Sequence, residues 1–230
     1  MSFSGKTTSS ETDFRRAQVY GFLSLAFLYP EENWTEDVPF IREGLRDLNG
    51  TDPVLEVKPL ELAELQRAYR QAFGLTGPLC YETEFGLPHE FRQSQELADL
   101  SGFYRAFGFT FGGAVRERPD HLAIELEFMH VLALKSCLAA TEGDPAHAEI
   151  CLEAQRNFLG DHLGLWADPF AKIVAQHAEG GPYPGLAQFA AAYIQADTDR
   201  LGASKGGLEV QRPTPFDPSF SCEGCPVDPS

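Results

Sequence analysis

Apolar residues recur every three or four positions along most of this chain, the spacing that places them on one face of an α-helix. Leucine and alanine far outnumber valine and isoleucine, and this balance also favours helix over strand. Breaks at proline, glycine and asparagine divide the pattern into predicted helices over residues 13–29, 36–48, 59–73, 94–107, from 119 onward, 145–162, 169–179 and 183–201. We therefore predict an all-α protein without strands.

The predicted helices form a single compact multi-helix domain over residues 13–203. Residues 1–12 are rich in serine, threonine and glycine, and we expect them to be disordered. Residues 204–230 contain several prolines and little periodicity, which indicates a flexible tail, extended or disordered. A chain of 230 residues is long enough for one large core.

The central predicted helix combines apolar surroundings with charged residues. Pro119 has the fixed φ of a first helical residue, and Asp120 favours the positive end of a helix. The helix is apolar on nearly every side, so we expect it in the interior. His121 and Glu125 nevertheless occupy its first turns, where their spacing would let the carboxylate accept from the imidazole. A binding site and a helix cap with one buried ion pair are both compatible with this pattern.

A second candidate region is the stretch 74–90, whose glycines and prolines interrupt the helical pattern. It carries Tyr81, Glu82 and Glu84 on a predicted loop between helices. An aromatic ring flanked by carboxylates suits a partner segment that is cationic and then apolar. The alternative is an acidic surface loop with Tyr81 tucked into the core.

Both regions carry a resemblance to a known family. Arg-Pro-Asp-His-Leu at 118–122, followed by Glu-Leu-Glu-Phe-Met at 125–129, resembles the central signature of the TorD/DmsD/NarJ family of redox-enzyme maturation chaperones. Cys-Tyr-Glu-Thr-Glu-Phe-Gly at 80–86 resembles the Tyr-Glu-(Ser/Thr) loop of the members that serve dimethyl-sulfoxide-reductase-type molybdoenzymes. The opening helix, Arg16 to Pro30, is also similar, so the resemblance spans roughly residues 14–200 and leaves out the tail.

The resemblance implies a helical fold of the TorD/DmsD type and a chaperone rather than an enzyme. Such a protein would bind the twin-arginine leader, the apo form, or both, of a molybdoenzyme catalytic subunit, assist insertion of the molybdenum cofactor and delay export. Asp120 and His121 match family positions on the surface thought to receive the leader. The residues that we expect to bind the leader are Tyr81, Glu82, Glu84, Asp120, His121 and Glu125, with Glu117 a further candidate for the acidic rim. The choice between a monomer and a domain-swapped dimer stays open, as does contact with a guanine nucleotide or the molybdenum cofactor.

Charge and cysteine content agree with this expectation. The chain has 18 Lys and Arg against 34 Asp and Glu, a formal net charge of −16, which argues against nucleic acid and anionic membranes and favours a basic partner. The longest uncharged apolar run, 19–29, is too short to span a bilayer. Five scattered cysteines and no recognisable secretory signal indicate the cytoplasm.

A metal-dependent enzyme is the rival hypothesis. Glu127 and His130 have the spacing found in di-iron helical bundles, but such sites need two copies of that motif and only one is present. The rival would build its centre from His121, Glu125, Glu127 and His130; otherwise His130 is a core or interface histidine. Cys222 and Cys225 supply two of the four ligands of a structural zinc, so a metal or redox role for this pair is the less favoured alternative.

Overall fold

The computed structural model describes residues 9–46, 48, 53–85, 90–110, 117–178 and 180–204. The elements in chain order are α1 (Ser9–Ala26), η1 (Trp34–Glu36), α2 (Val38–Arg46), α3 (Leu62–Phe73), η2 (Glu82–Glu84), α4 (Glu90–Ala106), α5 (Leu122–Glu142), α6 (Pro145–Phe158), η3 (Leu159–Leu163), α7 (Gly164–His177) and α8 (Tyr183–Leu201). In these residues there is no strand, only an isolated antiparallel bridge between Tyr81 and His121. The predicted all-α fold is confirmed.

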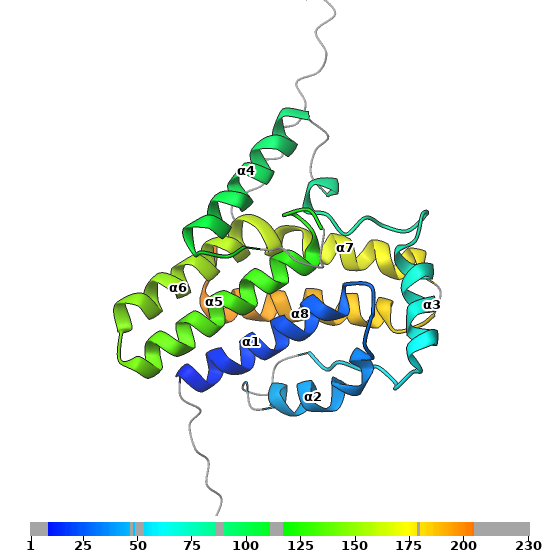
Figure 1. Ribbon diagram of the computed structural model, residues 1–230, viewed down its shortest axis with the longest axis horizontal. Helices are drawn as coiled ribbons and strands as arrows, with labels where there is room; N and C mark the ends of the chain where they lie inside the picture. The colour runs from blue at the N-terminus through cyan, green and yellow to red at the C-terminus, as the bar shows by residue number, and fades with distance from the viewer. Residues whose placement is uncertain are drawn as a thin grey trace, which may run out of the picture.

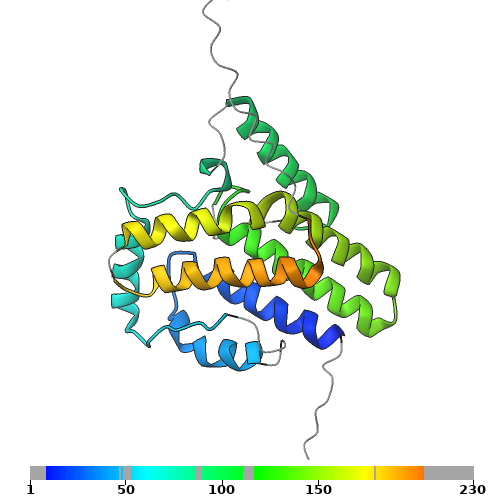
Figure 2. The same cartoon turned by 180° about the vertical axis from the view of Figure 1, so that it is seen from behind.

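Helices α1, α5, α6, α7 and α8 form the body of the molecule. Figure 1 shows α1 beside α5, which in turn lies beside α6, and Figure 2 shows α7 and α8 side by side on the opposite face. Helix α3 lies across one end, whereas α4 extends away from the bundle in both views. Among the described residues, no helix combines the length and apolar character needed to cross a membrane.

Helix α5 is central because it is apolar on nearly all sides, as its sequence predicts. Its contact with α1 is also polar. The Ser24 hydroxyl donates to the carbonyl oxygen of Ala123 at 2.8 Å, and Nδ1 of His130 lies 2.7 Å from the carbonyl oxygen of Ala17. A carbonyl only accepts, so Nδ1 carries the hydrogen. These bonds confirm His130 as an interface histidine.

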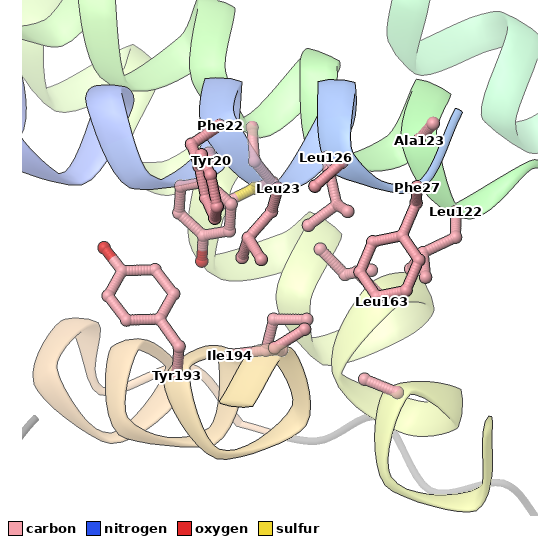
Figure 3. Packing of buried hydrophobic residues seen from close by; sticks show 14 of the residues in the cluster. Tyr20, Phe22, Leu23, Phe27, Leu122, Ala123, Leu126, Leu163, Tyr193 and Ile194 are labelled. Carbon is pink, nitrogen blue, oxygen red and sulfur yellow. The ribbon is translucent and has the colours of Figure 1, made fainter. Parts of the chain in front are cut away.

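The core fills the space between the α1–α5 layer and α8. In Figure 3, Tyr20 and Leu23 of α1 point toward α8, from which Tyr193 and Ile194 point back. All four are at most 1% exposed. Burial of this apolar surface stabilises the arrangement of helices on which the candidate site depends.

A buried polar network fastens α1 to α6 and α8. Nε and Nη2 of Arg16 donate to the two carboxylate oxygens of Asp197 at 2.7 and 2.8 Å, and its other donors reach Asp13 and Gln155. The Tyr20 hydroxyl also donates to Asp197 at 2.8 Å. Burial alone would raise the pKa of Asp197, but the Arg16 charge outweighs it and the pKa is lowered. The network therefore contains a buried carboxylate that is ionised and well paired.

The two predicted starts of helices α1 and α5 need correction. Helix α1 begins at Ser9, so residues 9–12, predicted to be disordered, are helical, and it ends at Ala26 rather than residue 29. Helix α5 begins at Leu122, not Pro119. The reason is that His121 takes the N-cap position, where its side chain accepts a hydrogen bond from the Ala123 N–H. Asp120 thus precedes the helix.

The predicted break between residues 162 and 169 is also wrong. Helix α6 runs through one π-helical turn, η3, directly into α7, and Pro169 lies inside α7 instead of starting a helix. The turn closes through the Gly164 N–H, which donates to the Leu159 carbonyl. The smaller differences are that α2 and α3 start at Val38 and Leu62 and α4 starts at Glu90. The predicted tail lies, apart from Ser204, outside the described residues.

Candidate functional site

The two segments that carry the sequence-predicted site residues lie against each other at the start of α5. We call them the junction and define it as residues 80–85 and 117–121. The main chains pair through the Tyr81–His121 bridge. The Glu82 N–H donates to the Asp120 carbonyl at 2.9 Å, and the Leu122 N–H donates to the Cys80 carbonyl at 2.8 Å. Two motifs separated by α4 in sequence therefore form one unit.

Asp120 holds the junction together and does not face solvent. Its side chain is 0% exposed and accepts from Nε and Nη2 of Arg118 at 2.9 and 2.7 Å. The Thr83 hydroxyl donates to the same carboxylate at 2.8 Å, and Arg118 donates to Thr83 in turn. Arg118 also lies over the Tyr81 ring, 4.4 Å from its centroid. Asp120 is therefore placed to position the loop.

Tyr81 is half-buried in the junction, and Glu84 is exposed at its edge. The Tyr81 hydroxyl donates to Oε2 of Glu117 at 3.0 Å. Burial, followed by this bond to Glu117, raises the pKa of Tyr81 to about 12. The phenol is therefore a neutral hydrogen-bond donor near neutral pH.

His121 and Glu125 do not form the pair that their spacing predicts. Nδ1 of His121 accepts from the Ala123 N–H at 3.1 Å, so this nitrogen carries no hydrogen. Burial lowers the pKa of His121, which agrees with a neutral ring. Glu125 instead accepts from Nε1 of Trp166 at 3.0 Å. The prediction fails because His121 lies before the helix and turns back to cap it.

Glu125 and Glu82 form a carboxyl pair in the protein interior. Nδ1 of His162 lies 3.2 Å from both oxygens of Glu82, whereas Oε1 of Glu125 has no donor among the described residues. Burial and then the negative charge of Glu82 raise the pKa of Glu125 well above its ordinary value. Burial also raises the pKa of Glu82, although His162 opposes this. Two ionised carboxylates cannot donate to each other, but a proton on Glu125 lets it donate to Glu82.

A cavity of about 490 Å³ opens beside this carboxyl pair, and we call it the Glu82 cavity. The residues that line it are Glu82, Phe85, Glu96, Ala98, Asp99, Gly102, Phe103, Asp161, His162, Leu165 and Trp166. They come from the junction, α4, η3 and α7. They include four carboxylates and no lysine or arginine, together with three aromatic rings apart from His162. Such a wall suits a ligand that is cationic on one side and apolar on the other.

A second cavity, of about 670 Å³, lies beyond the end of α1, and we call it the Glu117 cavity. It also combines apolar and acidic residues, which are Leu25, Leu28, Tyr29, Pro30, Trp34, Glu31, Glu32, Glu36, Asp37 and Glu117 together with Asn33. The sequence predicted Glu82 and Glu117 on one acidic rim. The structure assigns them to separate cavities.

Sequence reasoning missed His162 and Trp166. His162 was assigned no role beyond the end of a predicted helix, but this side chain is buried, with 6% exposed, and contacts Glu82. The error follows from the missed π-turn, because residues 159–163 turn differently from an α-helix. The four-residue separation of His162 and Trp166 was the available signal that both side chains lie on one side of the helix, where they line the same cavity.

The rival hypothesis of a metal centre has no supporting geometry in the part of the chain that the structure describes. No three His, Cys, Asp or Glu side chains there are close enough to share a metal ion. His121, Glu125 and His130 each bond to a different partner, namely Ala123, Trp166 and Ala17. Cys222 and Cys225 lie outside the described residues.

Sequence comparison assigns the chain to a family. The sequence model of the family described as nitrate reductase delta subunit matches residues 32–172, and the chain belongs to this family, which includes the NarJ and TorD chaperones. The selenate reductase assembly chaperone protein of Thauera selenatis is 30% identical over 197 residues, 83% of this chain and 92% of that protein. Chaperone protein TorD of Vibrio cholerae is 31% identical over 192 residues, 82% of each chain. The chlorate reductase assembly chaperone protein of Ideonella dechloratans is 31% identical over 180 residues, 75% of this chain and 86% of that protein. The predicted family is confirmed.

Proposed function

We propose that this protein is a cytoplasmic, non-catalytic chaperone that binds the amino-terminal leader of the catalytic subunit of a molybdenum oxidoreductase. It holds the subunit until the molybdenum cofactor is inserted and so delays export by the twin-arginine pathway. The family assignment and the names of the relatives support the chaperone role. The single observation that supports leader binding is the Glu82 cavity, which is acidic and apolar and adjoins both signature segments.

The chemistry of the cavity fits a leader of this kind. Arginines of the leader would meet carboxylates such as Glu82 and Asp99, and an apolar stretch after them would pack on Phe103 and Trp166. The net charge of −16 adds a long-range attraction for a basic segment. Binding should therefore weaken as salt screens these charges.

The Glu82 cavity is favoured over the Glu117 cavity for one reason. Its wall contains Glu82 from the first signature segment and is backed by Glu125 from the second, through Trp166. In this proposal Glu82 contacts the leader directly and Glu84 extends the acidic edge. Tyr81, Asp120 and His121 hold the loop that presents Glu82.

Calorimetry with a defined peptide tests the site. The probe is a synthetic peptide of about 20 residues with two adjacent arginines followed by a leucine-rich stretch, alongside a twin peptide with both arginines changed to glutamine. The double variant Glu82→Gln, Asp99→Asn should raise Kd for the arginine peptide by about tenfold or more, roughly 1.4 kcal/mol. The twin peptide should bind weakly to wild type and variant alike.

A matched control removes two charges from the other cavity. The double variant Glu31→Gln, Glu32→Gln removes the same number of negative charges as the Glu82 cavity variant, so the two variants weaken long-range attraction equally. It should nevertheless raise Kd less, because Glu31 and Glu32 line the Glu117 cavity and would not contact the peptide. If only the Glu117 cavity variant weakens binding, the chaperone function stands and the site moves. Equal affinity for both peptides would contradict recognition of the arginine pair.

The partner is tested separately. The tagged protein, purified from its native host, should bring with it the catalytic subunit of a molybdenum oxidoreductase, identified by mass spectrometry. That subunit should carry its uncleaved leader, and deletion of the leader should reduce recovery. Recovery that is unaffected by the deletion would place recognition in the mature subunit instead.

A further inference from the structure

The wall of the Glu82 cavity is backed by a carboxyl group whose bonding is incomplete. Glu125 is 0% exposed, and only its Oε2 has a donor, Nε1 of Trp166. Its Oε1 has no donor among the described residues. An ionised carboxylate with a bare oxygen is costly in the interior, but a proton on Oε1 removes that charge and provides a donor for Glu82.

We infer that Glu125 holds a proton beside Glu82 while the cavity is empty, and that a guanidinium group bound by Glu82 displaces this proton into solvent. This inference rests on the proposed function, since it concerns how the same cavity recognises the cationic part of a leader. It makes Glu125 a positioning residue, which acts on the ligand through Glu82.

The surroundings of the pair favour this exchange. The polar and titratable groups that contact or influence it are His162 from η3, Trp166 from α7, Glu96 and Tyr104 from α4, and Asp120 from the junction. The Tyr104 hydroxyl donates to the Pro119 carbonyl at 2.7 Å, and burial keeps its pKa well above the ordinary value, so it stays neutral. His162 is thus the one group of this set that can bring a positive charge, and it contacts Glu82 rather than Glu125. Glu125 can therefore ionise beside the Glu82 carboxylate only when a ligand brings another positive charge to the pair.

The proton and charge balance is simple. In the empty site, two carboxyl groups share one proton and carry one negative charge. When the guanidinium binds, the O–H bond at Oε1 of Glu125 breaks and the proton passes to the buffer. One cation enters as one proton leaves, so the net charge of the site is unchanged. No covalent bond forms to the ligand.

The exchange has a consequence for selectivity. Release of a proton makes binding tighter as pH rises, by up to about tenfold per pH unit while Glu125 remains protonated in the empty site. A neutral side chain brings no charge to stabilise the second carboxylate and releases no proton. Glu125 thereby helps the cavity discriminate arginine from a neutral residue of similar size.

Calorimetry in buffers of different ionisation enthalpy measures the released proton. With the arginine peptide described above, at about pH 7, wild type should release up to about one proton per peptide bound, and Glu125→Gln close to none. Glu125→Gln should still bind the peptide, because Glu82 and the apolar wall remain. The control Glu142→Gln, exposed on the same helix, should behave as wild type.

Two outcomes would overturn the inference. The first is proton release that persists in Glu125→Gln but disappears in His162→Gln, which would assign the proton to the imidazole. The second comes from the free protein: a carbon-13 NMR titration of its glutamate carboxyls, with Glu125 assigned through Glu125→Gln, should show Glu125 protonated near neutral pH. An ionised Glu125 there contradicts the inference whether or not the peptide binds. Failure of the peptide to bind while Glu125 is protonated would count against leader binding alone.

Discussion

Replacing Asp120 by alanine should destabilise the whole domain and not only a binding surface. The carboxylate is fully buried and receives two hydrogen bonds from Arg118 and one from the Thr83 hydroxyl. Its removal leaves Arg118 without its counter-ion and Thr83 without an acceptor. The junction would then depend on its few main-chain bonds.

The magnitude follows from how much of this network water can replace. Loss of a buried ion-pair partner costs about 3–5 kcal/mol. The Arg118 side chain is 37% exposed and regains part of its hydration, which lowers the expected loss to about 2–3 kcal/mol. For a chain of this length each kcal/mol corresponds to roughly 2–4 °C in Tm, so Tm should fall by about 4–12 °C.

The assay is thermal and urea unfolding followed by circular dichroism. Glu84→Ala is the matched control from the same junction, because its side chain is exposed and should change the free energy of unfolding by less than about 0.5 kcal/mol. Thr83→Val combined with Asp120→Ala should be less than additive, since both remove the same bond. A Tm for Asp120→Ala within about 2 °C of wild type would refute the role of Asp120 as the centre of the junction.

Three further predictions concern the interior. The folded-state pKa of Glu125 is raised, so ionisation of this group opposes folding. The wild-type free energy of unfolding, measured in urea, should therefore decrease as pH rises above the ordinary glutamate pKa, and it should decrease less in Glu125→Gln. Asp197→Asn should cost about 3–5 kcal/mol at neutral pH because Arg16 loses the carboxylate that pairs with its Nε and Nη2 and keeps only its bonds to Asp13 and Gln155. Because the pKa of Asp197 is lowered, the loss should shrink as acid protonates wild type, and an undiminished loss at acidic pH would contradict this account. Gly164→Ala would place a Cβ 2.3 Å from the Leu159 carbonyl oxygen, so the free energy of unfolding should fall by about 1–3 kcal/mol. The same change should weaken peptide binding, because it displaces His162. The control Gly44→Ala has open space around the new Cβ and should raise the free energy of unfolding by up to about 1 kcal/mol.

The sequence predicted the fold class because its signals are local. Helical spacing, proline and glycine breaks, and the all-round apolar character of α5 were enough to predict the order of the main helices in the described part of the chain, although two predicted helices, α6 and α7, are continuous. The predicted helix boundaries were wrong where tertiary contacts override the local conformational preference of the sequence. The first helix was predicted to begin at residue 13, but Asp13 lies inside α1, where it pairs with Arg16 in the buried network. Another helix was predicted to begin at Pro169, but Pro169 lies inside α7.

The candidate site was predicted in its parts and not in its arrangement. The resemblance indicated that residues 80–86 and 118–129 belong to one site, and the structure pairs residues 80–82 with residues 120–122. Which side chains face the cavity depends on turn geometry that spacing does not reveal. His121 turns to cap α5, Glu125 reaches Trp166 instead, and a π-turn brings His162 to Glu82. The roles of the predicted residues in leader binding stay predictions.

The main-chain bridge between Tyr81 and His121 constrains how this protein can be recombined with its relatives. The two segments of the junction pair through their main chains, and hydrogen bonds among Thr83, Arg118 and Asp120 join them. A hybrid with residues 80–85 from one homologue and residues 117–121 from another would combine two segments that did not evolve to pair with each other. Binding specificity should therefore transfer between relatives only when both segments are exchanged together.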